Sequence, residues 1–211
     1  MTHFIPLFPL PLVVYPGEKL NLHIFEPRYI QLITECHRND KHIGIPSVIN
    51  NQISELGTTV KILSIEQRYD DGSMDIKTEG QQVFKILETI KEIPDKLYSG
   101  AIVTYPENTR KSSINLMQKI MELIEQLHKQ IGTTKEFHKT IENLTSYDVA
   151  HYIGMSLQDE YELLRFSEEL HRQEYIKRHL LKNTPSVSQL SALQAKIQMN
   201  GHFKNIEGFT L

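Results

Sequence analysis

Residues 5–29, IPLFPLPLVVYPGEKLNLHIFEPRY, combine a high proline content with a mostly apolar composition. The stretch holds five prolines in 25 residues and only one lysine and one arginine. Proline breaks helices, while so many apolar side chains require burial. Within sheets, proline is confined to edges, first positions and bulges. The stretch therefore predicts strands at the boundary of a sheet, with apolar side chains that point into a barrel-like core.

The composition is that of a globular protein that needs no metal or disulfide to form a core. The chain has 211 residues, of which 39% are hydrophobic and 23% charged. A net charge of −3 argues against a general nucleic-acid binder. The single cysteine, Cys36, favours a reducing compartment. No lysine or arginine precedes Lys19 and no apolar run is long enough to span a membrane, so we expect no signal peptide and a cytoplasmic location.

The first half of the chain is expected to be mostly β. We predict strands over 3–10, 13–24, 42–49, 59–69, 74–80, 81–90 and 98–106, with an Asp-Gly hairpin turn after residue 69. A helix is predicted within 25–40, because Pro27 suits a first helical turn and four apolar residues recur at helical spacing. These residues are Tyr29, Leu32, Ile33 and Cys36.

The second half changes to a helical period. One apolar face runs from Met117 to Ile131, and Gly132 is expected to end that helix. Further helices are predicted at 134–143, 146–154, 157–165 and 167–182, and a short one within 187–197 before an irregular tail. The predicted division is a β subdomain over 1–110, a helical subdomain over 111–183, and a short helix with a tail over 184–211.

Known catalytic and cofactor motifs are absent from the sequence. It contains no P-loop, no G-x-G-x-x-G, no HExxH and no G-x-S-x-G. Cys36, His37 and His42 form the tightest group of metal-ligand types, but they are better explained as a buried thiol beside two solvent-facing imidazoles. Asp70, Asp71 and Asp75 suit a solvated hairpin turn. We therefore predict no catalytic residues, no metal and no cofactor.

The quoted stretch resembles the opening of the N-terminal, substrate-binding domain of the ATP-dependent protease Lon. The resemblance rests on Pro6–Leu10, on Tyr15-Pro16-Gly17 and on Leu22–Tyr29, and it continues in the block from Gly57 to Glu88. It implies an α+β fold, in which a PUA-like small β-barrel with one inserted helix precedes a helical bundle. It also implies no enzyme activity, because the phosphate loop of the Lon ATPase is missing here.

The resemblance further implies a non-catalytic module that recognises apolar or unfolded polypeptide segments, or that binds a separate ATP-dependent protease. The proline-rich stretch supplies the candidate contact residues, either as an exposed apolar rim or as filling for the barrel, and both readings remain open. The alternative function is RNA binding by a PUA-like barrel, although the acidic balance does not favour it. The candidate peptide-binding residues are Leu10, Leu12, Val13, Val14, Tyr15 and Pro16.

Overall fold

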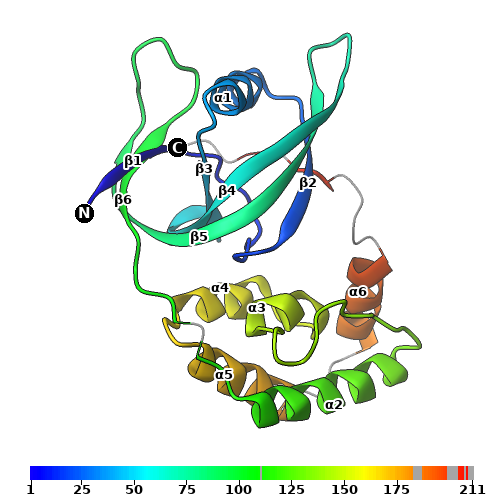
Figure 1. The fold of residues 1–211 in the computed structure, drawn as a ribbon. Coiled ribbons are helices and arrows are strands. Elements are labelled where there is room, and N and C mark those ends of the chain that lie inside the picture. The colour runs from blue at the N-terminus through cyan, green and yellow to red at the C-terminus, as the bar shows by residue number, and fades with distance from the viewer. Residues whose placement is uncertain (110, 183–186, 199–203, 207, 209–211) are drawn as a thin grey trace. The chain divides into compact units, whose positions relative to one another are not determined.

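The chain forms two compact units in a computed structural model (Figure 1). The structure describes residues 1–109, 111–182, 187–198, 204–206 and 208. The strand unit comprises Met1–Pro106 together with Gly201–Leu211, and the helical unit comprises Glu107–Asn200. The end of the chain therefore returns to the first unit.

The strand unit is built around two long antiparallel strands, β4 (Gln52–Arg68) and β5 (Met74–Ile90). On its other edge, β5 pairs first with β2 (Lys19–Ile24) and then with β6 (Gly100–Thr104). The outer strands are β1 (His3–Pro6), which pairs with β6, and β3 (Ile43–Ile49), which pairs with β4. All of these pairs are antiparallel, which confirms the predicted α+β class.

The helix α1 (Pro27–Arg38) lies where the sequence predicted it, with Pro27 in its first turn. Its four predicted apolar residues are all buried, and they share one core with side chains from the proline-rich stretch and from β2, β3, β4 and β5. The apolar spacing was therefore a correct guide to the inward face of α1. The buried residues are Tyr29, Leu32, Ile33 and Cys36.

The prediction of two strands over 74–80 and 81–90 was wrong, because β5 runs without interruption through Gly80. Gly80 does not interrupt the strand. A glycine is needed there because the backbone of residues 15–18 approaches it closely. Its N–H donates to the Glu18 carbonyl and its carbonyl accepts from Gly17, both at 2.8 Å. A Cβ at this position would lie 2.1 Å from the Tyr15 carbonyl oxygen.

The helical unit begins with α2 (Ile114–Gln130), whose N-cap is Ser113 and whose end agrees with the prediction. The remaining elements of this unit are α3 (Ser146–Val149), the 3₁₀ turn η1 (Ala150–Tyr152), α4 (Leu157–Arg165), α5 (Glu169–Lys182) and α6 (Val187–Gln198). The helix predicted at 134–143 is absent, and that segment is irregular. Two adjacent β-branched residues, Thr133 and Thr134, follow Gly132 directly and lower the helix propensity where that helix would begin.

A buried ion pair ties the helical unit together. Arg172 donates from Nε to Glu169 at 3.0 Å, and Glu169 also accepts from the backbone N–H and the hydroxyl of Ser146. The guanidinium further donates to the carbonyls of Phe166 and Thr109. Because Thr109 precedes α2 in the chain, this one side chain fastens the entering segment to the helices.

Residues 204 and 205 form an additional strand beside β2 in the strand unit. The two-residue strand β7 (Lys204–Asn205) pairs in parallel with β2, with Leu22 opposite Lys204 and His23 opposite Asn205. The adjoining Ile206 is partly buried and packs against the core that contains α1. The predicted irregular tail lies partly outside the described residues.

Candidate functional site

The structure places two of the six predicted contact residues inside the core of the strand unit. Leu10 and Val14 belong to the cluster that includes the α1 stripe, and they are 0% and 1% exposed. The Val14 carbonyl accepts a hydrogen bond from the Thr58 hydroxyl, so the backbone is fixed there as well. For these two residues, the reading as core filling is the one that the structure supports.

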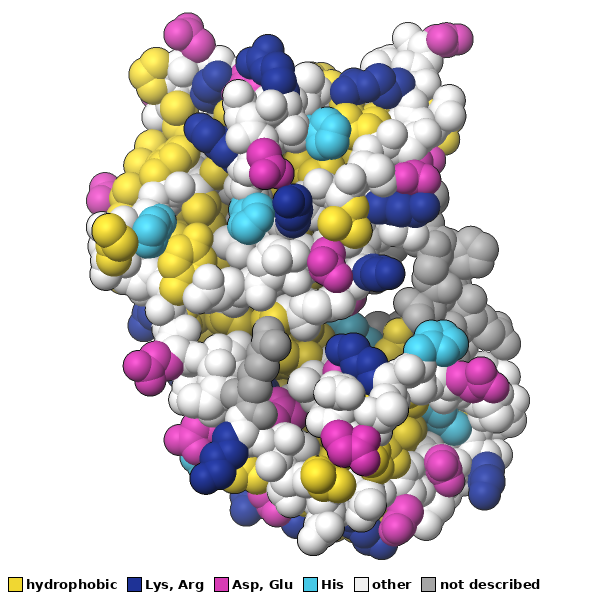
Figure 2. All heavy atoms as spheres, in the orientation of Figure 1, with side chains coloured by type: hydrophobic (Ala, Val, Ile, Leu, Met, Phe, Trp, Pro, Cys, Tyr) yellow, Lys and Arg dark blue, Asp and Glu magenta, His cyan; other side chains and the backbone are white. Residues whose placement is uncertain are grey.

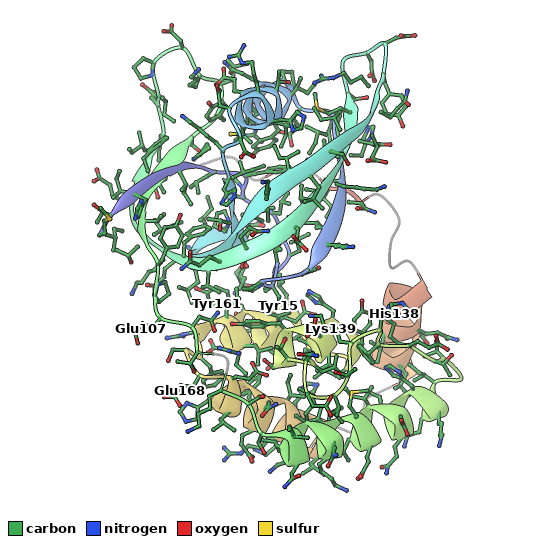
Figure 3. All side chains as sticks on the ribbon, viewed as in Figure 1. Tyr15, Glu107, His138, Lys139, Tyr161 and Glu168 are labelled. Carbon is green, nitrogen blue, oxygen red and sulfur yellow. The ribbon has the colours of Figure 1, made fainter. Side chains whose placement is uncertain are left out.

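The other four residues of this set lie around them. Leu12 is half-buried and packs against the same cluster, and Pro16 is also half-buried. Val13 and Tyr15 are buried. Tyr15 lies at the end of the strand unit that faces away from α1 (Figure 3). A role of these residues in peptide binding stays a prediction.

A cleft of about 580 Å³ opens at the other end of the strand unit, next to the C-terminal end of α1. Its walls come from β1, from the end of α1 with the turn after it, and from the loop between β5 and β6. Apolar side chains form much of this lining, and one of them, Phe4, is 50% exposed. The apolar lining consists of Phe4, Ile5, Pro6, Cys36, Ile93 and Tyr98.

Glu35 organises one wall of the cleft. Its carboxylate accepts from the Lys96 ammonium at 2.9 Å and from the Tyr98 hydroxyl at 2.6 Å. The Lys96 hydrogen bond is the largest of the causes that hold the pKa of Glu35 below its usual value. One turn earlier, Gln31 accepts from the Leu97 N–H and donates to the Asp95 carbonyl. The face of α1 thus holds the β5–β6 loop in a fixed conformation.

The polar rim of the cleft has a basic excess. Both carboxylates of the lining are paired, Glu35 with Lys96 at 2.8 Å and Asp40 with Lys61 at 3.4 Å. Arg38 and Lys41 also line the cleft and take part in no ion pair within the described part of the chain. An apolar lining with a cationic rim suits a polypeptide that carries apolar and acidic side chains.

Cys36 lies in this lining as a buried thiol, 3% exposed. Burial, together with the nearby Glu35 carboxylate, raises its pKa to about 11. A thiol that is protonated at neutral pH is a poor nucleophile. Cys36 therefore serves as an apolar packing residue here.

A second exposed feature is an aromatic group at the β4–β5 hairpin. The ring of His23 stacks on Phe25 and meets the edge of Tyr69, with centroids 6.2 and 5.6 Å apart. Asp75 accepts hydrogen bonds from both His23 and Tyr69. Asp70 and Asp71 are exposed in the same turn, and their charge would repel phosphate. This arrangement does not favour nucleic-acid stacking on the exposed rings.

Neither a metal centre nor a membrane span is indicated by the residues that the structure describes. Among them, no three histidine, cysteine, aspartate or glutamate side chains come together in a way that could hold a metal ion. No described helix has the length and apolar character needed to cross a membrane. On the face seen in Figure 2, hydrophobic side chains gather in several patches, and lysine, arginine, aspartate and glutamate side chains are scattered between them.

Residues 5–182 match the family described as the ATP-dependent protease La (LON) substrate-binding domain. The chain belongs to this family. Two solved structures share the fold, the Lon N-terminal domain protein from Xanthomonas campestris and the N-terminal domain of Mycobacterium avium complex Lon protease. They have TM-scores of 0.62 and 0.64 and identities of 20% and 14%, and they cover 87% and 86% of this chain. The matches cover 99% and 100% of those two chains.

Among curated proteins, Lon protease from Cytophaga hutchinsonii is 23% identical over 185 residues, which are 80% of this chain. Protein cereblon from Gallus gallus is 28% identical over 119 residues, or 54% of this chain. The matched regions span 23% and 26% of the length of those relatives. The resemblance found in the sequence to the Lon substrate-binding domain is thus confirmed.

None of the residues that line the cleft was among the predicted contact residues. Phe4, Lys96 and Tyr98 come from segments of the chain that are far apart, and no local motif marks them. The 50% exposure of Phe4 depends on which strands pack around it, so no signal in the sequence alone could have marked this residue.

Proposed function

We propose that this protein is a non-catalytic polypeptide-binding module, and that the cleft beside α1 takes an apolar side chain of a client segment. The observation that carries the proposal is the preformed apolar lining under a cationic rim, in a domain of a substrate-binding family. The ligand would be an unfolded or extended segment in which acidic residues flank an apolar anchor. A separate ATP-dependent protease is a partner that fits this role.

Phe4 is the residue whose contribution is simplest to estimate. A phenylalanine buries roughly 150–250 Å² when it is fully covered, and half of this residue is exposed, which leaves about 100 Å² for a ligand to cover. At about 25 cal/mol per Å², covering it contributes about 2.5 kcal/mol. Ordering the bound segment offsets part of this gain, so we expect a loss of about tenfold in affinity when Phe4 is made polar.

Fluorescence anisotropy with a reduced and alkylated, permanently unfolded polypeptide tests the proposal. Phe4→Asp should weaken binding about tenfold. Leu87→Asp is the matched control, because Leu87 is a strand residue of similar exposure, 54%, that is not among the residues lining the cleft. Equal losses in both variants, or no binding by the unchanged protein, would overturn the proposal.

Two further arms separate this site from the alternatives. Leu12→Asp reports on the proline-rich stretch, and a loss there without a loss in Phe4→Asp would move the site to that stretch. Salt separates the classes of ligand, because phosphate contacts weaken steeply with ionic strength while apolar burial does not. Binding of RNA that outcompetes the unfolded polypeptide would favour the PUA-like RNA-binding function instead.

A further inference from the structure

Glu26 occupies the N-cap position of α1, yet its side chain makes no capping hydrogen bond. One carboxylate oxygen instead accepts from the backbone N–H of Gly208 at 2.7 Å. The other accepts from Arg28, from Nε at 2.9 Å and from Nη2 at 2.6 Å. The Glu26 carboxylate, which would ordinarily cap the first turn of α1, thus accepts from a residue that is 182 positions away in the sequence.

Arg28 completes the contact from the other side. Its Nη2 donates to the carbonyl oxygen of Gly208 at 3.1 Å. The ion pair therefore binds both the N–H and the C=O of one backbone residue, as a neighbouring strand would. The guanidinium itself lies over the ring of Tyr29, 4.6 Å from its centroid, so its position is fixed as well.

Tyr29 makes the position selective for glycine. A Cβ on residue 208 would lie 2.2 Å from one ring carbon of Tyr29 and 2.6 Å from its hydroxyl oxygen. The ring has little room to withdraw, since it is 3% exposed and packs against Phe8 with centroids 4.1 Å apart. We call Glu26, Arg28 and Tyr29 the glycine clamp.

The contacts continue from the clamp to the edge of the sheet. Asn205 pairs with His23 of β2, and Ile206 packs against the core of the strand unit. The strand unit thus recognises an extended backbone through ladder pairing, one apolar side chain, and a glycine two residues further on. Backbone pairing at a sheet edge with selective pockets for alternate residues is a general mode of peptide recognition.

We propose that the edge of β2 and the glycine clamp form a binding site for an extended polypeptide with an apolar residue two positions before a glycine, and that residues 204–206 and 208 of this chain occupy it. The site is distinct from the cleft beside α1, because none of the clamp residues lines that cleft. This second site adds a ligand class to the proposed polypeptide-binding function. It rests on that function in one respect only, namely that client segments compete with the resident segment for the site.

The test uses the full-length chain and a fluorescent peptide with the sequence of residues 202–211. In the unchanged protein the resident segment competes at a high effective concentration, so the peptide should bind weakly. Gly208→Val in the chain displaces the resident segment, and the peptide should then bind at least tenfold more tightly. The same peptide with valine in place of its glycine is the matched control, and it should not bind to either chain.

Adding Arg28→Ala to the Gly208→Val chain should weaken peptide binding about tenfold again, because a charge-assisted hydrogen bond is lost. Equal affinity for the glycine and valine peptides would overturn the proposal. So would equal affinity of the unchanged and Gly208→Val chains for the glycine peptide. A dimer of the unchanged protein that dissociates in the Gly208→Val chain would overturn the assignment of the segment to its own chain.

Hydrogen exchange supplies a second measurement that does not require Gly208→Val to fold. The Gly208 amide should exchange slowly in the unchanged protein and at least tenfold faster in Glu26→Ala, with Glu66→Ala, an exposed carboxylate on β4, as the control. Fast exchange of this amide in the unchanged protein would overturn the proposal. The cleft assay with Phe4→Asp is independent, so failure of the clamp and failure of the proposed function give different results.

Discussion

Replacing Arg172 with methionine removes a guanidinium that is 2% exposed as a side chain and leaves Glu169, 1% exposed, as a buried carboxylate without its cation. Methionine keeps much of the aliphatic length, so the change tests charge and hydrogen bonding more than volume. We expect the helical unit to lose stability while the strand unit keeps its own. The reasoning rests on four contacts of one side chain that lie within the helical unit.

The magnitude follows from what each partner loses. Breaking a buried ion pair by removing one partner costs about 3–5 kcal/mol. Glu169 keeps its hydrogen bonds from the N–H and hydroxyl of Ser146, at 2.6 and 2.8 Å. The cost of leaving this carboxylate without its cation should therefore lie near the lower end of that range, at about 3 kcal/mol. The carbonyls of Thr109 and Phe166 also lose a charged donor. We therefore expect a total of about 4 kcal/mol.

The assay is urea unfolding combined with hydrogen exchange resolved by peptide. Arg172→Met should raise exchange in α2, α3 and α5 and leave β2 to β6 unchanged. The double variant Arg172→Met/Glu169→Gln removes the stranded charge while an amide oxygen remains for Ser146, so it should recover about 2 kcal/mol. A loss below about 1 kcal/mol in the single variant, or no recovery in the double variant, would refute the reasoning.

Four further outcomes are expected. Gly80→Ala should destabilise the strand unit by about 1–3 kcal/mol in urea unfolding, because the added Cβ meets the Tyr15 carbonyl oxygen, and a change near zero would contradict the close approach. Cys36 should react slowly with iodoacetamide at pH 8 until the protein is unfolded. Burial raises the folded pKa of Cys36 from 9.0 to about 11, so stability that is fully present below pH 9 should fall between pH 9 and 11, and Cys36→Val should remove that part of the fall. Glu35→Gln should increase exchange of the Leu97 region and weaken client binding, because the carboxylate that pairs with Lys96 is lost, and unchanged exchange there would show that Gln31 alone fixes the loop.

Local spacing was enough to predict the parts of the fold whose cause is local. The Tyr29–Cys36 stripe of α1 and the apolar face of α2 both lie in the positions expected from helical periodicity. The predicted boundary between strands 74–80 and 81–90 is wrong, since β5 continues through Gly80. Glycine is needed at position 80 because the Tyr15 backbone packs closely against it. Tyr15 is distant in the sequence, and no periodicity reveals such a contact.

The candidate contact residues show the same limit. Apolar residues between prolines are compatible both with an exposed rim and with a core, and the choice depends on which strands cover them. For Leu10 and Val14 the covering residues come from α1 and from the strands of the strand unit. Thr58, whose hydroxyl holds the Val14 carbonyl, is 44 residues away. A sequence window around the prolines does not contain this information.

The stretch Phe25–Tyr29 shows how one short motif can have a use that its local reading hides. Pro27 starts the helix as the sequence predicts, and an acidic residue such as Glu26 at that end complements the helix dipole. The structure adds that three side chains of this stretch converge on the backbone of Gly208. If Glu26 were only a helix-dipole residue, Glu26→Gln would weaken α1 slightly and leave the Gly208 amide protected. If it belongs to the clamp, the same variant should deprotect that amide, because a neutral acceptor replaces a charged one.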